Sequence, residues 1–154
     1  MADSKRQKII SAVINRMEGI SVDDDYETDL GERVRDWEVN FQDEELPVLS
    51  VCDTVGDINF VNDNLDAPSQ VHKLPVLLRV FCKSDTRAAD LRKMMADLIR
   101  AVGVDPNWTD ADDKKLAMWT RVTKAGIIVP AENFEIAGAA VELEIAYLVN
   151  RFEF

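Results

Sequence analysis

The chain has 154 residues, a length typical of one domain, and we expect residues 1–154 to form a single unit. It contains 29 acidic and 18 basic residues, so its formal charge of -11 disfavours duplex DNA binding through phosphate contacts and docking on an anionic membrane. No apolar run approaches the roughly 20 residues of a membrane-spanning helix, so we expect no membrane partner.

The first expected element is an amphipathic helix over residues 4–18, because apolar residues recur at helical spacing and Gly19 follows as a stop signal. An acidic segment, "SVDDDYETDLGE" (21–32), comes next. Its alternating carboxylates raise the question of calcium, but an EF-hand loop needs glycine at its sixth position, where this chain has Thr28. We therefore interpret the segment as a solvated acidic loop.

The next two expected strands differ in pattern. Residues 34–41 alternate, with Trp37, Val39 and Phe41 on one face, which is typical of a half-buried strand. Residues 46–53 are more continuously apolar, so both faces should be covered. Pro47 cannot donate a ladder hydrogen bond and belongs at a strand start or on an edge.

Residues 57–61 could return as a hairpin partner, and residues 62–70 have loop composition. The longest expected strand covers 72–84. A helix capped by Ser84 or Asp85 should follow it and run to about Val102, because an apolar stripe begins at Leu91 and Gly103 and Pro106 follow the stripe.

The C-terminal third is expected to contain a short extra helix and further strands. Residues 109–118 place acids first and lysines last, as a helix dipole favours. Residues 119–123 and 126–129 are two short strand candidates, and 139–149 is a clean strand whose Glu142 and Glu144 share one face. Strands mixed with two long helices predict an α+β fold with a mixed, largely antiparallel sheet and both main helices on one face.

Few residues suggest catalysis. His72 is the only histidine, so a two-histidine metal site is excluded, and no phosphate-binding or dinucleotide-binding glycine motif is present. We expect no catalytic residue, no metal and no cofactor, and we expect His72 at a solvated strand start. Cys52 and Cys82 lie in apolar runs and are expected to be buried free thiols in a reducing compartment.

Two tryptophans flank the expected short helix. Trp108 and Trp119 could both pack onto the core, or one of them could be exposed as an interface anchor, because tryptophan is enriched at protein–protein hot spots.

Nearly the whole chain resembles the tail terminator (tail completion) proteins of long-tailed bacteriophages. The resemblance rests on the order of an opening helix, "RQKIISAVINRM", a short strand after acids, "DEELPVLSVCDTVGD", a long strand running into a helix, "HKLPVLLRVFCKSDTRAADLRKMMADLIRAV", and a closing strand, "GAAVELEIAYLVNRFEF". It implies a non-enzymatic virion protein that forms a homo-hexameric ring. The ring would cap the completed tail tube, end addition of tube subunits and provide the docking surface for head-to-tail connector proteins.

The resemblance also implies location and partners. The protein would lie at the head-proximal end of the tail and in the host cytoplasm during assembly. DNA would pass through the ring without specific binding, and an acidic lumen would favour sliding. Glu142, Glu144 or the acids at 23–25 are the candidates to face the lumen. The long irregular segments 21–33, 54–70 and 104–119 are expected to carry the other contacts. Candidate interface residues are Asp23, Asp24, Asp25, Tyr26, Asp57, Asn59, Asn62, Asp63, Trp108 and Trp119.

Two alternatives remain open. The chain could be another phage neck or tail-tube subunit, because fold alone does not fix role. It could also be a small cytosolic acidic regulatory protein or enzyme. In that case His72, the acids at 23–25 and Tyr26 would be its distinctive residues, and they would have to meet in a pocket.

Overall fold

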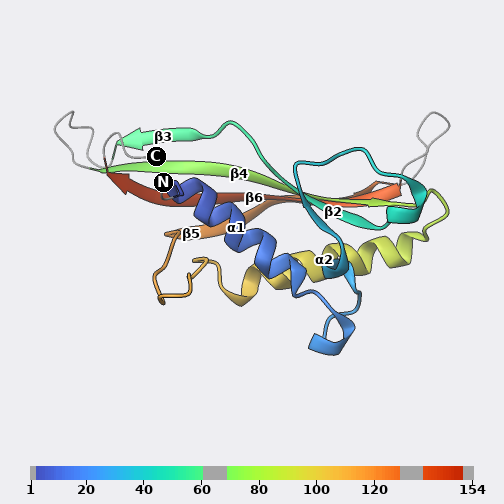
Figure 1. Cartoon of the computed structure of the whole chain (residues 1–154). Coiled ribbons are helices and arrows are strands. Elements are labelled where there is room, and N and C mark those ends of the chain that lie inside the picture. Colours follow the sequence, from blue (N-terminus) through green and yellow to red (C-terminus); the bar gives the residue numbers. More distant parts are fainter. Residues whose placement is uncertain (1–2, 61–68, 129–136, 151–154) are drawn as a thin grey trace.

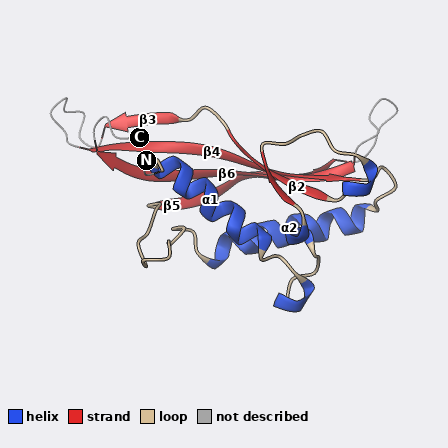
Figure 2. Cartoon of the chain, viewed as in Figure 1, coloured by secondary structure: helices blue, strands red, loops and turns tan. Residues whose placement is uncertain are grey.

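The computed structural model describes residues 3–60, 69–128 and 137–150, which form a mixed β-sheet with two long helices packed on one face (Figures 1 and 2). The helices are α1 (Lys5–Glu18) and α2 (Ala88–Val104). The strands are β1 (Val34–Asp36), β2 (Val48–Asp53), β3 (Asp57–Phe60), β4 (Ser69–Cys82), β5 (Trp119–Ile128) and β6 (Ala137–Asn150). Short 3-10 turns lie at Val22–Asp24 (η1), Leu30–Glu32 (η2) and Asp43–Glu45 (η3). The predicted fold class is confirmed.

The sheet has the order β1-β2-β4-β6-β5, and β3 pairs with the remaining length of β4. Among the described strands, only β1 and β2 are parallel; the other four pairings are antiparallel. β4 and β6, with 14 residues each, run side by side through the middle. Their period-two alternation explains this position, since every second residue from Leu74 to Cys82 and from Val141 to Val149 is buried beneath the helices.

The opening helix forms as predicted. Ser4 caps it by accepting the Gln7 backbone N–H, and the chain leaves it at Gly19. Its buried face, led by Ile9 and Val13, packs in the same core as Leu91 and Leu98 of α2. The two helices therefore cover one face of the sheet together.

The predicted start of α2 was wrong, and the helix ends two residues after the predicted end near Val102. Lys83 to Thr86 form a turn in which the Thr86 N–H donates to the Lys83 carbonyl, so neither Ser84 nor Asp85 is the cap, and the capping position is Arg87. The helix continues through Gly103 and ends at Val104. It ends there because Asp105 precedes Pro106 and is extended, as proline disfavours the helical conformation in the residue before it.

The predicted strand over 34–41 is much shorter. β1 ends at Asp36 because Trp37 adopts a left-handed backbone conformation with φ of 62°. The side chains of Trp37 and Val39 are 50% and 47% exposed, so the predicted buried face does not exist. The strand expected over 46–53 is confirmed as β2, with Pro47 directly before it, and its residues are buried on both faces from Val48 to Cys52.

Three further predictions need correction. The short helix near 109–118 is absent; this part of the chain consists of turns with one isolated bridge between Thr109 and Lys115. The two strand candidates after it form a single strand, β5, interrupted by a β-bulge between Val122 and Lys124. β3 pairs with β4 and not with β2. Residues 69 and 70 of the expected loop belong to β4, and residues 62–68 lie outside the described residues.

Candidate functional site: surfaces available for assembly

The acidic loop of residues 21–32 connects α1 to β1 and consists of the turns η1 and η2. Ser21 begins it by accepting the Asp23 N–H, and the Asp29 carboxylate accepts the Val22 N–H at 2.9 Å. The side chains of Asp23, Asp24 and Asp25 are all exposed. The structure therefore places the three predicted interface acids together at the surface, on a loop held by its own hydrogen bonds.

A buried carboxylate on α2 anchors this loop. Asp97 is only 2% exposed, and it accepts the Glu27 backbone N–H at 3.2 Å and the Thr28 hydroxyl at 2.6 Å. Arg100, also on α2, donates to the Asp25 carbonyl and stacks on the ring of Tyr26, with 4.8 Å between guanidinium and ring centroid. Sequence reasoning did not identify Asp97 as a buried residue, because a charged residue on a helix is usually exposed to solvent.

Tyr26 does not project with the acids beside it. Its ring is half-buried, lies under Arg100 and packs against the hydrophobic core. These contacts fix the acidic loop to the helices, so Tyr26 differs from the exposed acids beside it, and its assignment as an interface residue stays a prediction.

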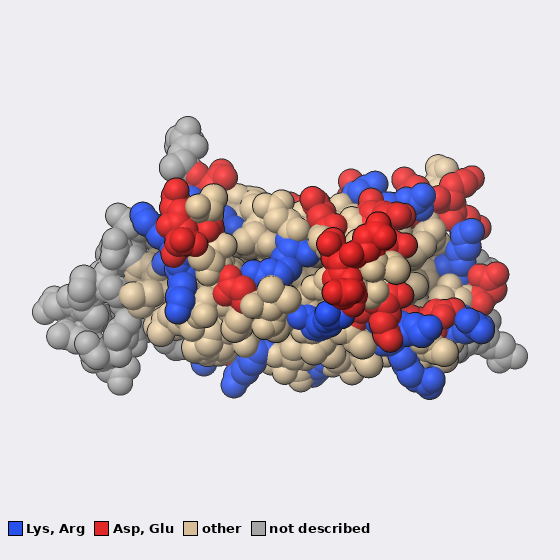
Figure 3. Space-filling model, turned by 90° about the horizontal axis from the view of Figure 1, so that it is seen from below, with Lys and Arg blue, Asp and Glu red and all other residues tan. Residues whose placement is uncertain are grey.

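The acids of this region surround a shallow hollow of about 440 Å³ at the C-terminal end of α1. Its lining includes four acidic residues, Glu18, Asp23, Asp29 and Glu32, together with the exposed Val22. Figure 3, which views the side of the molecule with the helices, shows a group of Asp and Glu side chains near the middle of this side. Within the described residues, no group of His, Cys, Asp and Glu side chains is arranged to hold a metal ion.

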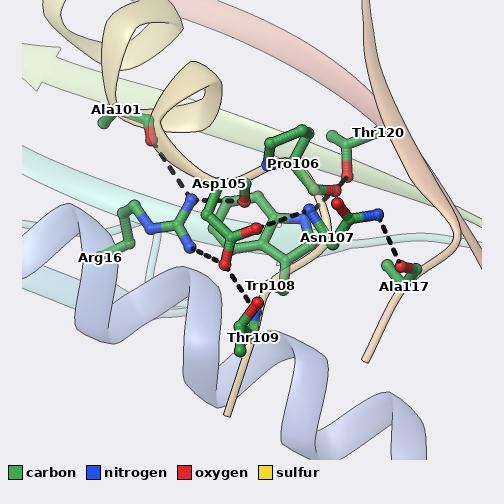
Figure 4. A network of polar contacts seen from close by, with 9 residues as sticks. All are labelled: Arg16, Ala101, Asp105, Pro106, Asn107, Trp108, Thr109, Ala117 and Thr120. Atoms are coloured by element: carbon green, nitrogen blue, oxygen red, sulfur yellow. Dashed lines mark hydrogen bonds and ion pairs between the residues drawn. The ribbon is translucent and has the colours of Figure 1, made fainter. Parts of the chain in front are cut away.

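The segment between α2 and β5 is held by a polar network around Trp108 (Figure 4). The Asp105 carboxylate accepts the backbone N–H groups of Asn107 and Thr109 and lies 3.4 Å from the Arg16 guanidinium. Burial alone would raise the pKa of Asp105, but these hydrogen bonds, with the Arg16 charge, outweigh burial and hold the pKa below its usual value. The Asn107 side chain donates to the Ala117 carbonyl at 3.1 Å, so the network joins both ends of the segment to α1.

Trp108 is the centre of this network and is fully buried. Its indole N–H donates to the Thr120 hydroxyl at 2.8 Å, and the Arg16 guanidinium lies 4.3 Å from its ring centroid. Trp108 is thus a core residue and not an interface anchor. Trp119, at the start of β5, is half-buried with the Arg121 guanidinium 5.1 Å from its ring centroid.

The most exposed tryptophan in the described chain is Trp37, which sequence reasoning placed in a buried strand face. Its indole N–H donates to Asp53 at 2.9 Å, and Arg6 donates to the other oxygen of the same carboxylate at 2.7 Å. Burial would raise the pKa of Asp53, but the bonds from Trp37 and Arg6 outweigh burial and lower it. A half-exposed indole is therefore fixed in one orientation at the surface.

Glu142 and Glu144 lie, as predicted, on the face of the sheet opposite the helices, but they do not form a bare acidic surface. The Arg121 guanidinium of β5 is 2.8 Å from Glu144. Glu142 accepts the Thr123 hydroxyl at 3.2 Å, and Lys124 is its register partner on β5. Both carboxylates thus have polar or cationic neighbours within the same chain.

The remaining predicted interface residues are only partly described. Asp57 and Asn59 belong to β3 and lie opposite Lys73 and Val71 of β4 in the backbone register. Asn62 and Asp63 lie outside the described residues.

No known family model and no curated protein matches the chain. In the described part of the chain, no helix combines the length and the apolar character needed to cross a bilayer.

The residues named for an enzyme or regulator do not meet. His72 is 6% exposed, at a buried position and not at the solvated strand start predicted for it, and its ring lies 5.2 Å from that of Tyr147. Burial and the nearby Arg6 charge lower its pKa. Arg6 is in the first turn of α1, whereas Asp23 and its neighbours follow the last turn, about 20 Å away along a 14-residue helix. His72 and the acids at 23–25 therefore cannot line one pocket.

Proposed function

We propose that this chain is a tail terminator subunit of a long-tailed phage. Six copies form a ring that caps the completed tail tube, ends tube polymerisation and presents the docking surface for head-to-tail connector proteins. Its location would be the head-proximal end of the tail, after assembly in the host cytoplasm. The protein acts by contact alone, without a reaction or a cofactor.

The observation that carries the proposal is the order of elements. An opening helix, an acidic loop, a short buried strand, a long strand leading into a long helix, and a long closing strand follow one another as in the resemblance drawn from the sequence. The long strand and the long helix are β4 and α2, and the closing strand is β6. Because fold alone does not fix role, the assembly behaviour has to be tested directly.

The distribution of charge is compatible with this role. The exposed acids at 23–25 lie on a loop fixed by Asp97 and Arg100, so they can be presented to a partner without a large ordering cost. Net negative charge would also favour sliding of DNA through a ring over binding of DNA.

The first test is mass by light scattering and negative-stain electron microscopy, on the purified protein alone and with purified tail tubes. A six-subunit ring or density at one tube end supports the proposal. Long self-polymerised tubes would make the chain a tube subunit, and a monomer that ignores tubes would favour the regulator or enzyme alternative.

The second test is charge reversal of the acidic loop. Replacing Asp23, Asp24 and Asp25 together by Lys should reduce the joining of tails to heads. The free energy of unfolding, measured with urea, should stay within about 0.5 kcal/mol of wild type, because these side chains are exposed. The matched control reverses the exposed acids of η3, Asp43–Glu45, and should join tails normally. Normal infectivity after reversal at 23–25 would remove this loop from the contact surface.

A further inference from the structure

Trp37 carries a large aromatic ring at the surface, directly after the edge strand β1. Its side chain is 50% exposed. Its indole N–H donates to the Asp53 carboxylate, and its backbone N–H donates to the Val51 carbonyl at 3.1 Å. Because both donors are already bonded, the surface left for a partner is the carbon surface of the ring.

The other aromatic side chains that the structure describes each have a covering group. Four of them lie under an arginine guanidinium, 4.3 to 5.1 Å from the ring centroid: Trp108 under Arg16 (Figure 4), Phe81 under Arg79, Tyr26 under Arg100 and Trp119 under Arg121. The rings of Phe41 and Tyr147 each pack against another ring. Within the described residues, Trp37 has neither a cation over its face nor a second ring against it.

The charges around this ring are mainly negative. Asp36 and Glu38 flank the tryptophan in the sequence, and both side chains are exposed. Glu38 lies 3.8 Å from Arg35, which is a weak pair because both groups face solvent. The Asp53 carboxylate is paired with Arg6. Asp36 has no ion pair in the part of the chain that the structure describes, so one negative charge beside the ring lacks a cation.

The hydrogen bond to Asp53 strengthens the attraction of the ring for a cation. The face of an indole carries negative partial charge, and tryptophan is the aromatic side chain that binds a cation best. Donation of the N–H to a carboxylate moves electron density into the ring, because hydrogen bonds polarise the groups that they join. Burial alone would raise the pKa of Asp53, but the bonds from Trp37 and Arg6 lower it, so the carboxylate stays ionised at neutral pH.

The backbone holds the ring in place before any partner arrives. Trp37 has a φ of 62°, in the left-handed region that bulky residues rarely adopt. This conformation ends β1, and the bonds to Val51 and Asp53 stabilise it. Because the side chain is already ordered, little of its conformational freedom is lost when a partner binds.

The chemistry of the surface selects arginine over lysine and another protein over a second copy. A guanidinium group is planar, so it can stack on an indole and donate hydrogen bonds to nearby carboxylates at the same time, whereas an ammonium group cannot stack. Each copy of this chain has a net charge of -11, so contact between two copies is opposed by repulsion. A partner with a positively charged surface is attracted instead.

We propose that Trp37, with Asp36 and Glu38 beside it, is a docking point for an arginine side chain of a different protein. Arg6 shares the Asp53 carboxylate with this ring and lies in the first turn of α1, about 20 Å from the exposed acids that follow the last turn. The two surfaces can therefore hold two partners. That the partner is a tail or head protein rests on the proposed function, whereas the chemistry of the contact does not.

The direct test is an NMR titration of the isotope-labelled full chain with the capped tripeptide acetyl-Gly-Arg-Gly-amide, which has no terminal charges. The Trp37 ring signals should respond, with half-saturation at about a threefold lower concentration than with the matching lysine peptide at the same ionic strength. The ring signals of Trp108 and Trp119 are internal controls, because arginines of the chain already cover these rings. No response of Trp37, or an equal response to the neutral citrulline peptide, overturns the inference.

Two variants separate the ring from the charges. Trp37→Leu should abolish the response of the backbone signals of residues 36–38 to the arginine peptide. The double variant Asp36→Asn with Glu38→Gln keeps the ring and should raise the half-saturating concentration about threefold, because exposed ion pairs are weak. Its matched control, Asp43→Asn with Glu44→Gln, removes two exposed acids of η3 and should bind the peptide as wild type does. Equal binding by the two double variants contradicts the role of the flanking acids.

Assembly assays then test the partner. Trp37→Leu should weaken binding of the chain to purified tail tubes or to heads about tenfold, as loss of a central interface tryptophan does, and should leave ring formation unchanged. Unchanged binding to both overturns the inference and leaves the proposed function standing. Trp37 signals that shift on dilution of the free protein would make a second copy the occupant and also overturn it. A chain that ignores tubes and heads but binds the arginine peptide at Trp37 supports the inference and contradicts the proposed function.

Discussion

Replacing Asp97 by Ala should loosen the acidic loop from the rest of the molecule. Asp97 is buried on α2 and accepts two hydrogen bonds from the loop, one from the Glu27 N–H and one from the Thr28 hydroxyl. A hydrogen bond to a charged group contributes about 1.5–3 kcal/mol to stability. Water can reach both donors after the substitution, because Glu27 is exposed and Thr28 is half-exposed, and removal of a buried charge recovers some desolvation energy. We therefore expect a loss of about 2 kcal/mol in the free energy of unfolding.

The assay is urea unfolding at pH 7, with Thr28→Val and the double variant completing a cycle. Thr28→Val alone should cost about 1 kcal/mol. The double variant should lose less than the sum of the two single losses by about 1 kcal/mol, because the 2.6 Å hydrogen bond can be lost only once. Limited proteolysis within residues 21–32 should accelerate in Asp97→Ala.

The control is Asp90→Ala, which removes a partly exposed carboxylate of the same helix that pairs with Arg87. It should change stability by less than about 0.5 kcal/mol. If Asp97→Ala costs no more than Asp90→Ala, or if its effect is additive with Thr28→Val, then Asp97 does not anchor the loop and the account of its rigidity is wrong.

Three further predictions concern the core. Trp108→Phe should lower the free energy of unfolding by about 1–2 kcal/mol, because it removes the hydrogen bond to Thr120 and part of a fully buried ring. The urea midpoint should fall with it, and an unchanged midpoint would contradict this. Burial raises the pKa of Cys82 to about 11, so roughly a thousandth of this thiol is ionised at pH 8, and a disulfide reagent should label it only on unfolding. The pKa of His72 is lowered by burial and by the Arg6 charge, so the unfolded chain binds this proton more tightly. The contribution of neutral His72 to stability is complete above about pH 6.5 and is lost as the pH falls toward the folded pKa. In urea titrations, the free energy of unfolding should therefore fall less between pH 7.5 and pH 5.5 in His72→Gln than in wild type.

The elements that sequence reasoning found correctly are those whose pattern and burial agree locally. β4 and β6 alternate over 14 residues, and the apolar spacing of α1 ends at a glycine. In these segments, the period of the sequence and the period of the structure are the same, so no information from distant residues is needed.

The errors occur where distant residues decide the conformation. The alternation of residues 34–41 predicted a strand, but the Trp37 N–H and indole bind Val51 and Asp53, which the sequence pattern does not place beside it. Residues 109–118 have a helix-like charge order. The Asp110 carboxylate accepts the N–H groups of Asp112 and Lys114 and stabilises turns in place of a helix.

The same limit applies to the candidate surfaces. Alternation was enough to place Glu142 and Glu144 on the open face of the sheet. Their neighbours on β5 depend on a register that shifts at the β-bulge between Val122 and Lys124, and no sequence pattern showed that bulge. The buried role of Asp97 was equally hidden, because its partners are about 70 residues away along the chain.

The placement of charge restricts how copies of this chain can approach one another. Each added copy brings a further net charge of -11, so a stable contact has to join surfaces where charge is balanced or opposite in sign. On the described surface, the acidic loop at 21–32 would repel the same loop of a neighbour. The face opposite the helices pairs Arg121 with Glu144 and sets Lys124 opposite Glu142, so its charges are largely compensated. In the proposed ring, the sheet is therefore the surface on which two copies repel each other least, and the anchored acidic loop would be left for a different partner.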